Sequence, residues 1–127
     1  MNHLLLIAVG GAAGAAARHL VGQAALKWLG PGWPWGTLAV NVLGGLAMGL
    51  LVGWLAAKEP PFAPALRYGL GVGLLGGFTT FSAFSLEVVL MLERRAWGAA
   101  GGYVALSVVG AVGALFLGLL IARKAFG

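Results

Sequence analysis

A run rich in glycine and threonine in the middle of the chain combines residue types that can hold a small ion. The run GGFTTFSAF, residues 76–84, follows Gly69, Gly71 and Gly73. Glycine and β-branched threonine are poor helix formers, so a helix is expected to break within this stretch. The carbonyls freed by a break would suit a hard monovalent cation better than a transition metal. The alternative is an unbroken helix whose glycines serve only close packing.

Two phenylalanines at the end of this run could act on an anion. Phe81, Phe84 and Val88 fall on one helical face, and Glu87 lies close beside that face. The positive edge of an aromatic ring can face an anion. Aromatic residues at this spacing are also typical of ordinary core or lipid-facing positions, which is the competing interpretation.

Neutral hydrogen-bond donors recur elsewhere in the apolar sequence. Asn41 follows Thr37 by one helical turn, and Ser107 follows Tyr103 by one turn. The amide NH₂ group and the hydroxyls can each donate to an anion. Arg18 is the one cation well inside an apolar stretch, where it either serves a function or extends its charge toward water. Together these side chains favour conduction or transport of a small anion.

No group of side chains in the sequence resembles a catalytic or zinc centre. The sequence has no cysteine, and His3 and His19 are isolated from any ligand or catalytic pattern. The 8 Lys and Arg residues are scattered singly or in pairs and form no basic patch of the kind that binds nucleic acid. We therefore expect neither an enzyme nor a nucleic-acid partner.

The elements that must position these residues are membrane-spanning helices. Of the 127 residues, 61% are hydrophobic and 9% are charged, which is too little charge to cover a soluble domain. A helix needs about 20 mostly apolar residues to cross the hydrocarbon. Four stretches qualify, at residues 3–26, 36–57, 64–92 and 97–122. The sequence thus predicts an all-α integral membrane protein, with residues 1–127 forming a single four-helix transmembrane domain.

Within a bilayer, the expected break in the helix must lie against protein or a polar cavity and not against lipid. Irregular backbone at membrane depth is tolerated only against protein or a polar cavity. Small residues must supply the close contacts between helices, and glycines recur at a spacing of four residues in each expected span. A subunit of this size encloses no obvious aqueous path, so a pore is expected where two subunits meet.

The charges at the two faces of the expected bundle are nearly balanced. The face with both termini carries Lys58, Arg67, Arg123 and Lys124, and the opposite face carries Lys27, Arg94, Arg95 and, if it reaches that far, Arg18. Cytoplasmic loops normally hold an excess of Lys and Arg, and neither face has one. Our hypothesis is that the chain inserts in both orientations and pairs as an antiparallel homodimer. The alternative is that a residue outside this count fixes one orientation.

Over essentially its whole length, the sequence resembles the Fluc/CrcB family of fluoride channels. The motifs that carry the resemblance are GGAAGAAAR at 10–18, GTLAVNVLG at 36–44 and GGFTTFSAF at 76–84. The resemblance implies an antiparallel, dual-topology homodimer of four-helix subunits whose third helix is broken in mid-membrane. It also implies a structural sodium ion at the dimer centre, held by the backbone carbonyls of Gly76 and Thr79.

The resemblance also assigns an ion pathway. Phe81 and Phe84 are similar to the residues whose ring edges line the fluoride path, and Asn41 is similar to its amide donor. The polar track beside them is implied for Thr37, Tyr103, Ser107 and Glu87, and Arg18 ends the first motif. The sequence departs from the family at Ala83, His19 and Ala111, which affects the detail of the polar track.

We therefore expect a fluoride-selective channel of the cell (inner) membrane that passively and electrogenically exports fluoride and lowers its toxicity. The alternative is a proton-coupled exporter of the small multidrug or guanidinium type. That mechanism needs a glutamate in the first helix, whose expected span contains no acidic residue. A purely structural membrane subunit would leave the run at 76–84 and Asn41 unexplained.

Overall fold

The computed structural model describes residues 3–127, and all regular structure in this range is helical. Four helices are long and apolar enough to cross a membrane, which confirms the number predicted from hydropathy. Three of them are α1 (His3–Leu29), α2 (Trp35–Lys58) and α6 (Trp97–Phe126). The third span, Ala63–Glu93, is built from α3 (Ala63–Leu66), η1 (Arg67–Leu75), α4 (Gly76–Phe78) and α5 (Phe81–Glu93).

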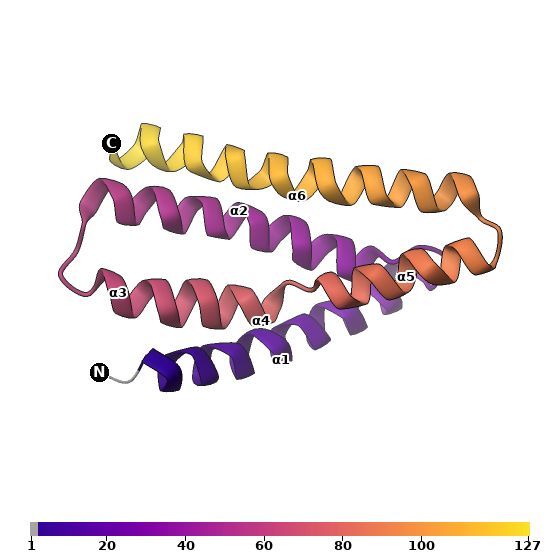
Figure 1. The fold of residues 1–127 in the computed structure, drawn as a ribbon, viewed down its shortest axis with the longest axis horizontal. Coiled ribbons are helices and arrows are strands. Elements are labelled where there is room, and N and C mark those ends of the chain that lie inside the picture. Colours follow the sequence, from indigo (N-terminus) through magenta and orange to yellow (C-terminus); the bar gives the residue numbers. More distant parts are fainter. Residues whose placement is uncertain (1–2) are drawn as a thin grey trace.

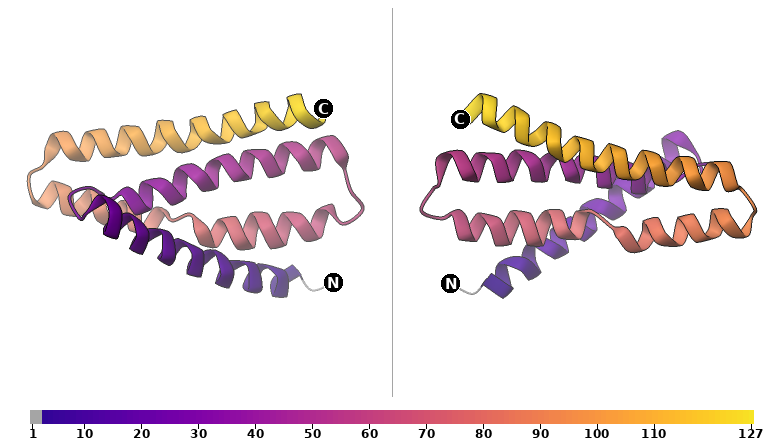
Figure 2. Two further views of the ribbon diagram at one scale, coloured as in Figure 1. Left: turned by 180° about the vertical axis from the view of Figure 1, so that it is seen from behind. Right: turned by 45° about the horizontal axis from the view of Figure 1, so that its top comes forward.

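The helices run alternately up and down, so the two ends of the chain lie at the same end of the molecule (Figure 1). α2 and α6 lie side by side, whereas α1 crosses the third span obliquely (Figure 2). α1 and α2 both contact α4, and α2 and α6 both contact α5. Residues from all four spans therefore approach the junction between α4 and α5.

Glycines allow α2 and α6 to pack backbone against backbone. A Cβ atom at Gly49 would overlap the Leu115 carbonyl, and one at Gly45 would lie 2.7 Å from the Ala111 carbonyl oxygen. From the other helix, a Cβ atom at Gly118 would lie 2.8 Å from the Leu50 nitrogen. Helices in lipid associate through such close contacts, so this pair forms a rigid support for the rest of the bundle.

A second glycine contact joins α1 to the third span. A Cβ atom at Gly14 would lie 2.8 Å from the Phe78 nitrogen, and one at Gly77 would lie 2.6 Å from the Gly11 carbonyl oxygen. No side chain fits between these backbones. This contact fixes the position of α4, the last helical turn before the backbone changes direction.

The backbone of the third span is extended at Thr79 and Thr80. The π-helical segment η1 leads into the short helix α4, after which Thr79 has φ −84° and ψ 158° and Thr80 has φ −151° and ψ 121°. α5 then begins at Phe81, and the Thr80 side chain caps it by accepting a hydrogen bond from the Ala83 N–H at 3.1 Å. We call these two extended residues the interruption.

Candidate functional site

The amide of Asn41 on α2 binds the interruption through both of its polar atoms. Nδ2 donates to the Thr80 carbonyl at 3.0 Å, and the Thr80 N–H donates to Oδ1 at 2.8 Å. The pair replaces hydrogen bonds that a continuous helix would make. Asn41 therefore holds the backbone in place, and the second N–H of its amide is not used by this pair.

Arg18 on α1 binds the same region from the other side. Its Nε donates to the Gly77 carbonyl oxygen at 3.1 Å, and its side chain is half-buried. The guanidinium is thus attached to the backbone of α4 rather than extended along the bundle surface. Of the two alternatives that the sequence left open, this geometry favours a position inside the site.

Glu87 on α5 joins two hydroxyls from different helices. Thr37 on α2 donates to Oε2 at 3.0 Å, and Tyr103 on α6 donates to Oε1 at 3.0 Å. Tyr103 is completely buried. Hydrogen bonds to an ionised carboxylate are stronger than neutral ones, so this group links α2, α5 and α6 at one level of the bundle.

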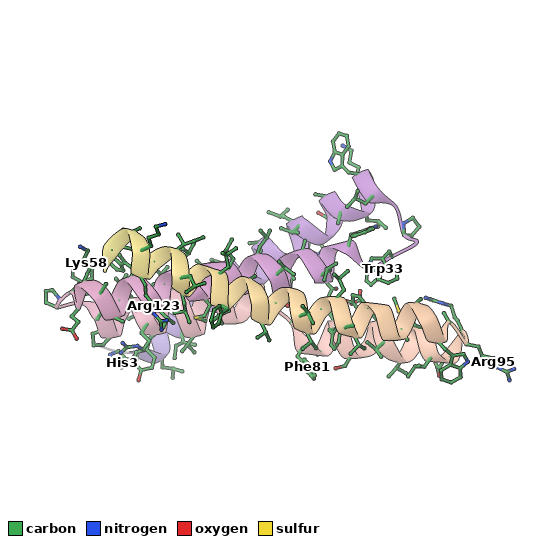
Figure 3. The ribbon with its side chains drawn as sticks, turned by 90° about the horizontal axis from the view of Figure 1, so that it is seen from above. His3, Trp33, Lys58, Phe81, Arg95 and Arg123 are labelled. Carbon is green, nitrogen blue, oxygen red and sulfur yellow. The ribbon has the colours of Figure 1, made fainter. Side chains whose placement is uncertain are left out.

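Three aromatic rings follow one another from the surface to the core. The ring centroids of Phe81 and Phe84 are 5.5 Å apart, and those of Phe84 and Tyr103 are 5.2 Å apart. Phe84 is buried, whereas Phe81 is 78% exposed and points away from the bundle (Figure 3). The two phenylalanines of the sequence motif therefore lie in different surroundings.

An open cavity of about 420 Å³, which we call the central cavity, is lined by several of the site residues predicted from the sequence. Its lining includes Asn41, Gly76, Thr79, Phe81, Phe84 and Ser107. The Ser107 hydroxyl is buried and has no hydrogen-bond partner among residues 3–127. Most of the lining is apolar, and a few neutral donors converge on it.

A second cavity, of about 330 Å³, lies between the α1–α2 connection and the last turns of α5. We call it the end cavity. Thr37 and Glu87 line it, together with Trp33 and Arg94. Arg18 lines neither of these two cavities but a third one of about 300 Å³, together with Thr37 and Thr80. Tyr103 lies against Phe84 of the central cavity and Glu87 of the end cavity.

Trp33 was not predicted as a site residue. A tryptophan among glycines and prolines near a helix end is typical of a residue at the membrane interface. Its indole instead stands edge-on to the Tyr103 ring, at a centroid distance of 5.7 Å and an interplanar angle of 85°. No sequence signal distinguishes it from the neighbouring Trp35, because the distinction arises from packing against α6.

Two backbone carbonyls at the interruption lose their usual helical partners. The Thr80 N–H, which would bind the Gly76 carbonyl in a continuous helix, donates to Asn41. The Ala83 N–H, which would bind the Thr79 carbonyl, donates to the Thr80 side chain. In the part of the chain that the structure describes, no cluster of three His, Cys, Asp or Glu side chains could hold a metal. The donor set here is neutral oxygen, which fits a monovalent cation and not a transition metal.

Comparisons with known proteins identify the family of the chain. Residues 5–119 match the family model of CrcB-like protein, Camphor Resistance (CrcB). A protein of Phenylobacterium zucineum named fluoride-specific ion channel FluC is 61% identical over 126 residues, which is 99% of both chains. Proteins with the same name from Caulobacter vibrioides and Hyphomonas neptunium are 57% and 55% identical, also over 99% of both chains.

Proposed function

The chain belongs to the CrcB-like family, and we propose that it is a fluoride-selective ion channel. The observation that carries this proposal is identity of 61% over 126 residues, 99% of both chains, to a protein named fluoride-specific ion channel. The names of the relatives indicate a channel rather than an enzyme. The competing proton-coupled exporter needs an acidic residue in its first helix, and α1 has none.

The neutral donors of the central cavity account for fluoride binding. Fluoride is small and strongly hydrated, so a path must replace its water with donors at close range. The free N–H of Asn41, the unpartnered hydroxyl of Ser107 and the ring edges of Phe81 and Phe84 can do this. None of these groups carries a fixed positive charge that would retain the ion too long.

A second copy of the chain would complete the path. The central cavity is open to the outside, and Phe81 extends from its rim, 78% exposed apart from its contact with the Phe84 ring. We infer an antiparallel homodimer in which both copies contribute to each path, consistent with the balanced basic residues at the two ends. The interruption at Thr79 and Thr80 then lies in mid-membrane near the dimer centre, within a single domain formed by the whole chain.

The same arrangement supports a structural sodium ion. The carbonyls of Gly76 and Thr79 lose helical partners at the interruption, and both residues line the central cavity. Two carbonyls from each copy would supply four neutral oxygens. When bound, the ion would be coordinated by these carbonyl oxygens and would hold the two interruptions together. Asn41 and Arg18, which bind the backbone on either side, keep the carbonyls in position.

The proposed cellular role is passive, electrogenic export of fluoride across the cell (inner) membrane, which lowers fluoride toxicity. The test is fluoride release from liposomes that contain the purified protein, measured with a fluoride electrode and started with a potassium ionophore. We expect ionophore-dependent fluoride release without parallel chloride release. No fluoride release from a folded, reconstituted dimer would reject the proposal and favour proton-coupled cation export.

A further inference from the structure

Trp33 is packed into the bundle although it belongs to the connection between α1 and α2. Its indole lies against the buried cluster of Phe84, Met91, Ala100 and Tyr103. In Figure 3 it lies near the end of the molecule marked by Arg95 and far from Lys58. The edge-on contact with Tyr103 places it directly beside the group formed by Tyr103 and Glu87.

The indole N–H is buried and has no hydrogen-bond partner in the described chain. Leaving a buried donor unpaired costs about 1–3 kcal/mol, so an acceptor outside the chain is expected. Within the buried cluster, the one side-chain hydroxyl is that of Tyr103, and its proton is already donated to Glu87. The neighbouring side chains therefore supply no evident acceptor.

The end cavity, which Trp33 lines, has the properties of an anion entrance. Arg94 and Glu87 are the charged residues in its lining. The exposed Arg94 guanidinium attracts an anion. Glu87 would repel one, but both of its carboxylate oxygens accept hydrogen bonds from the hydroxyls of Thr37 and Tyr103, which weakens the repulsion. Those two hydroxyl protons are committed to the carboxylate, so the Trp33 N–H is the buried neutral donor left uncommitted here.

We propose that the Trp33 indole N–H donates a hydrogen bond to fluoride in the end cavity, before the ion reaches Tyr103 and Phe84. Trp33 is then a further residue of the conduction path, and this inference rests on the proposed channel function. Because the N–H has almost no accessible surface in the described chain, the indole must turn toward the end cavity for this bond to form. The low local dielectric constant then strengthens the bond. A buried indole donor also favours a small, strongly accepting anion over chloride.

The test replaces the Trp33 indole with benzothiophene, by incorporating β-(3-benzothienyl)alanine into the full-length protein. This side chain keeps the shape of tryptophan and lacks the N–H. We expect fluoride flux to fall about tenfold, which corresponds to about 1.4 kcal/mol. The matched control is the same replacement at Trp97, which is 66% exposed on α6. We expect wild-type flux from the control.

A second measurement separates ion contact from packing. The indole ¹⁵N–¹H signals of the 5 tryptophans can be recorded during titration with fluoride and with chloride, and Trp33→Phe assigns the relevant signal. We expect the Trp33 signal to shift with fluoride and not with chloride. Unchanged flux in the benzothiophene variant, or a Trp33 signal that does not shift when fluoride is added, would overturn the inference. Absence of flux in the unmodified protein would instead reject the channel function itself.

Discussion

At the scale of single residues, substitutions at Phe81 and Phe84 distinguish an effect on conduction from an effect on stability. We expect Phe81→Ile to abolish fluoride flux, because a branched aliphatic side chain offers no positive ring edge to the ion. Phe81 is 78% exposed in the subunit, so subunit unfolding should change little. Phe84→Ile should also abolish flux and lower stability by about 1 kcal/mol, because Phe84 packs against Tyr103.

Fluoride release from liposomes measures the effect on conduction, and detergent unfolding measures the effect on stability. The matched control is Phe116→Ile, since Phe116 is 60% exposed on α6 and lines neither the central nor the end cavity. It should behave as the wild type. Wild-type flux in both Phe81→Ile and Phe84→Ile would show that the rings are not part of the path.

Asn41 supports a second prediction at this scale. Asn41→Leu keeps the size of the side chain but leaves the N–H and carbonyl of Thr80 without partners. We expect a loss of about 2 kcal/mol or more in unfolding free energy, together with loss of flux. The control is Thr79→Val, which removes one hydroxyl bond to a carbonyl that also accepts from the Thr79 N–H. Equal stability of the two variants in detergent unfolding would contradict the structural role of Asn41.

At the scale of elements, contact between α1 and the third span depends on Gly14. A methyl group there would overlap the Leu74 carbonyl, and α1 would have to move away from α4. We expect Gly14→Ala to destabilise the subunit by about 1–3 kcal/mol. The control on the same helix is Gly22→Ala, where an added Cβ would have no atom of another element within 4 Å, so alanine should be neutral or slightly stabilising. Comparable unfolding midpoints for the two variants would exclude this contact as a stabilising feature.

Hydropathy was sufficient to find the four spans, but not the composition of the third one. Helix propensity marks residues 69–80 as weak, because glycine and threonine are poor helix formers. It does not specify a π-helical segment at Arg67–Leu75, since that geometry is adopted where the backbone packs against α1. The ends of α1 and α6 also extend beyond the spans expected from hydropathy, because a helix need not stop where the hydrocarbon does.

The site residues were predictable as residue types, whereas their partners were not. Asn41, Glu87 and Tyr103 stand out as polar residues in apolar helices. Their pairing depends on the crossing of helices distant in sequence: Asn41 meets Thr80 39 positions away, and Arg18 meets Gly77 59 positions away. The packing of Trp33 against Tyr103 likewise depends on how the α1–α2 connection meets α6. The sequence thus shows which polar side chains are present, whereas helix packing determines which of their atoms come into contact.

At the scale of the whole molecule, the distribution of basic residues between the two ends of the bundle is expected to determine how the chain is oriented in the membrane. His3, Lys58 and Arg123 lie toward one end of the bundle and Arg95 lies at the other (Figure 3). If the chain inserts in both orientations, a tag at the C-terminus should react with membrane-impermeant reagent on both sides of the membrane. Labelling on one side only would contradict dual insertion.

The balance of basic residues between the two ends of the bundle can be changed by removing a single charge. Arg95→Gln removes a positive residue from the end opposite the termini, and the positive-inside tendency should then hold the termini in the cytoplasm. Because an antiparallel dimer needs both orientations, flux per protein should fall in the same variant, and coexpression with an oppositely biased variant should restore it. The control is Glu93→Gln at the same end, since acidic residues contribute little to orientation. Full flux from Arg95→Gln in one orientation would mean that the channel does not require antiparallel pairing.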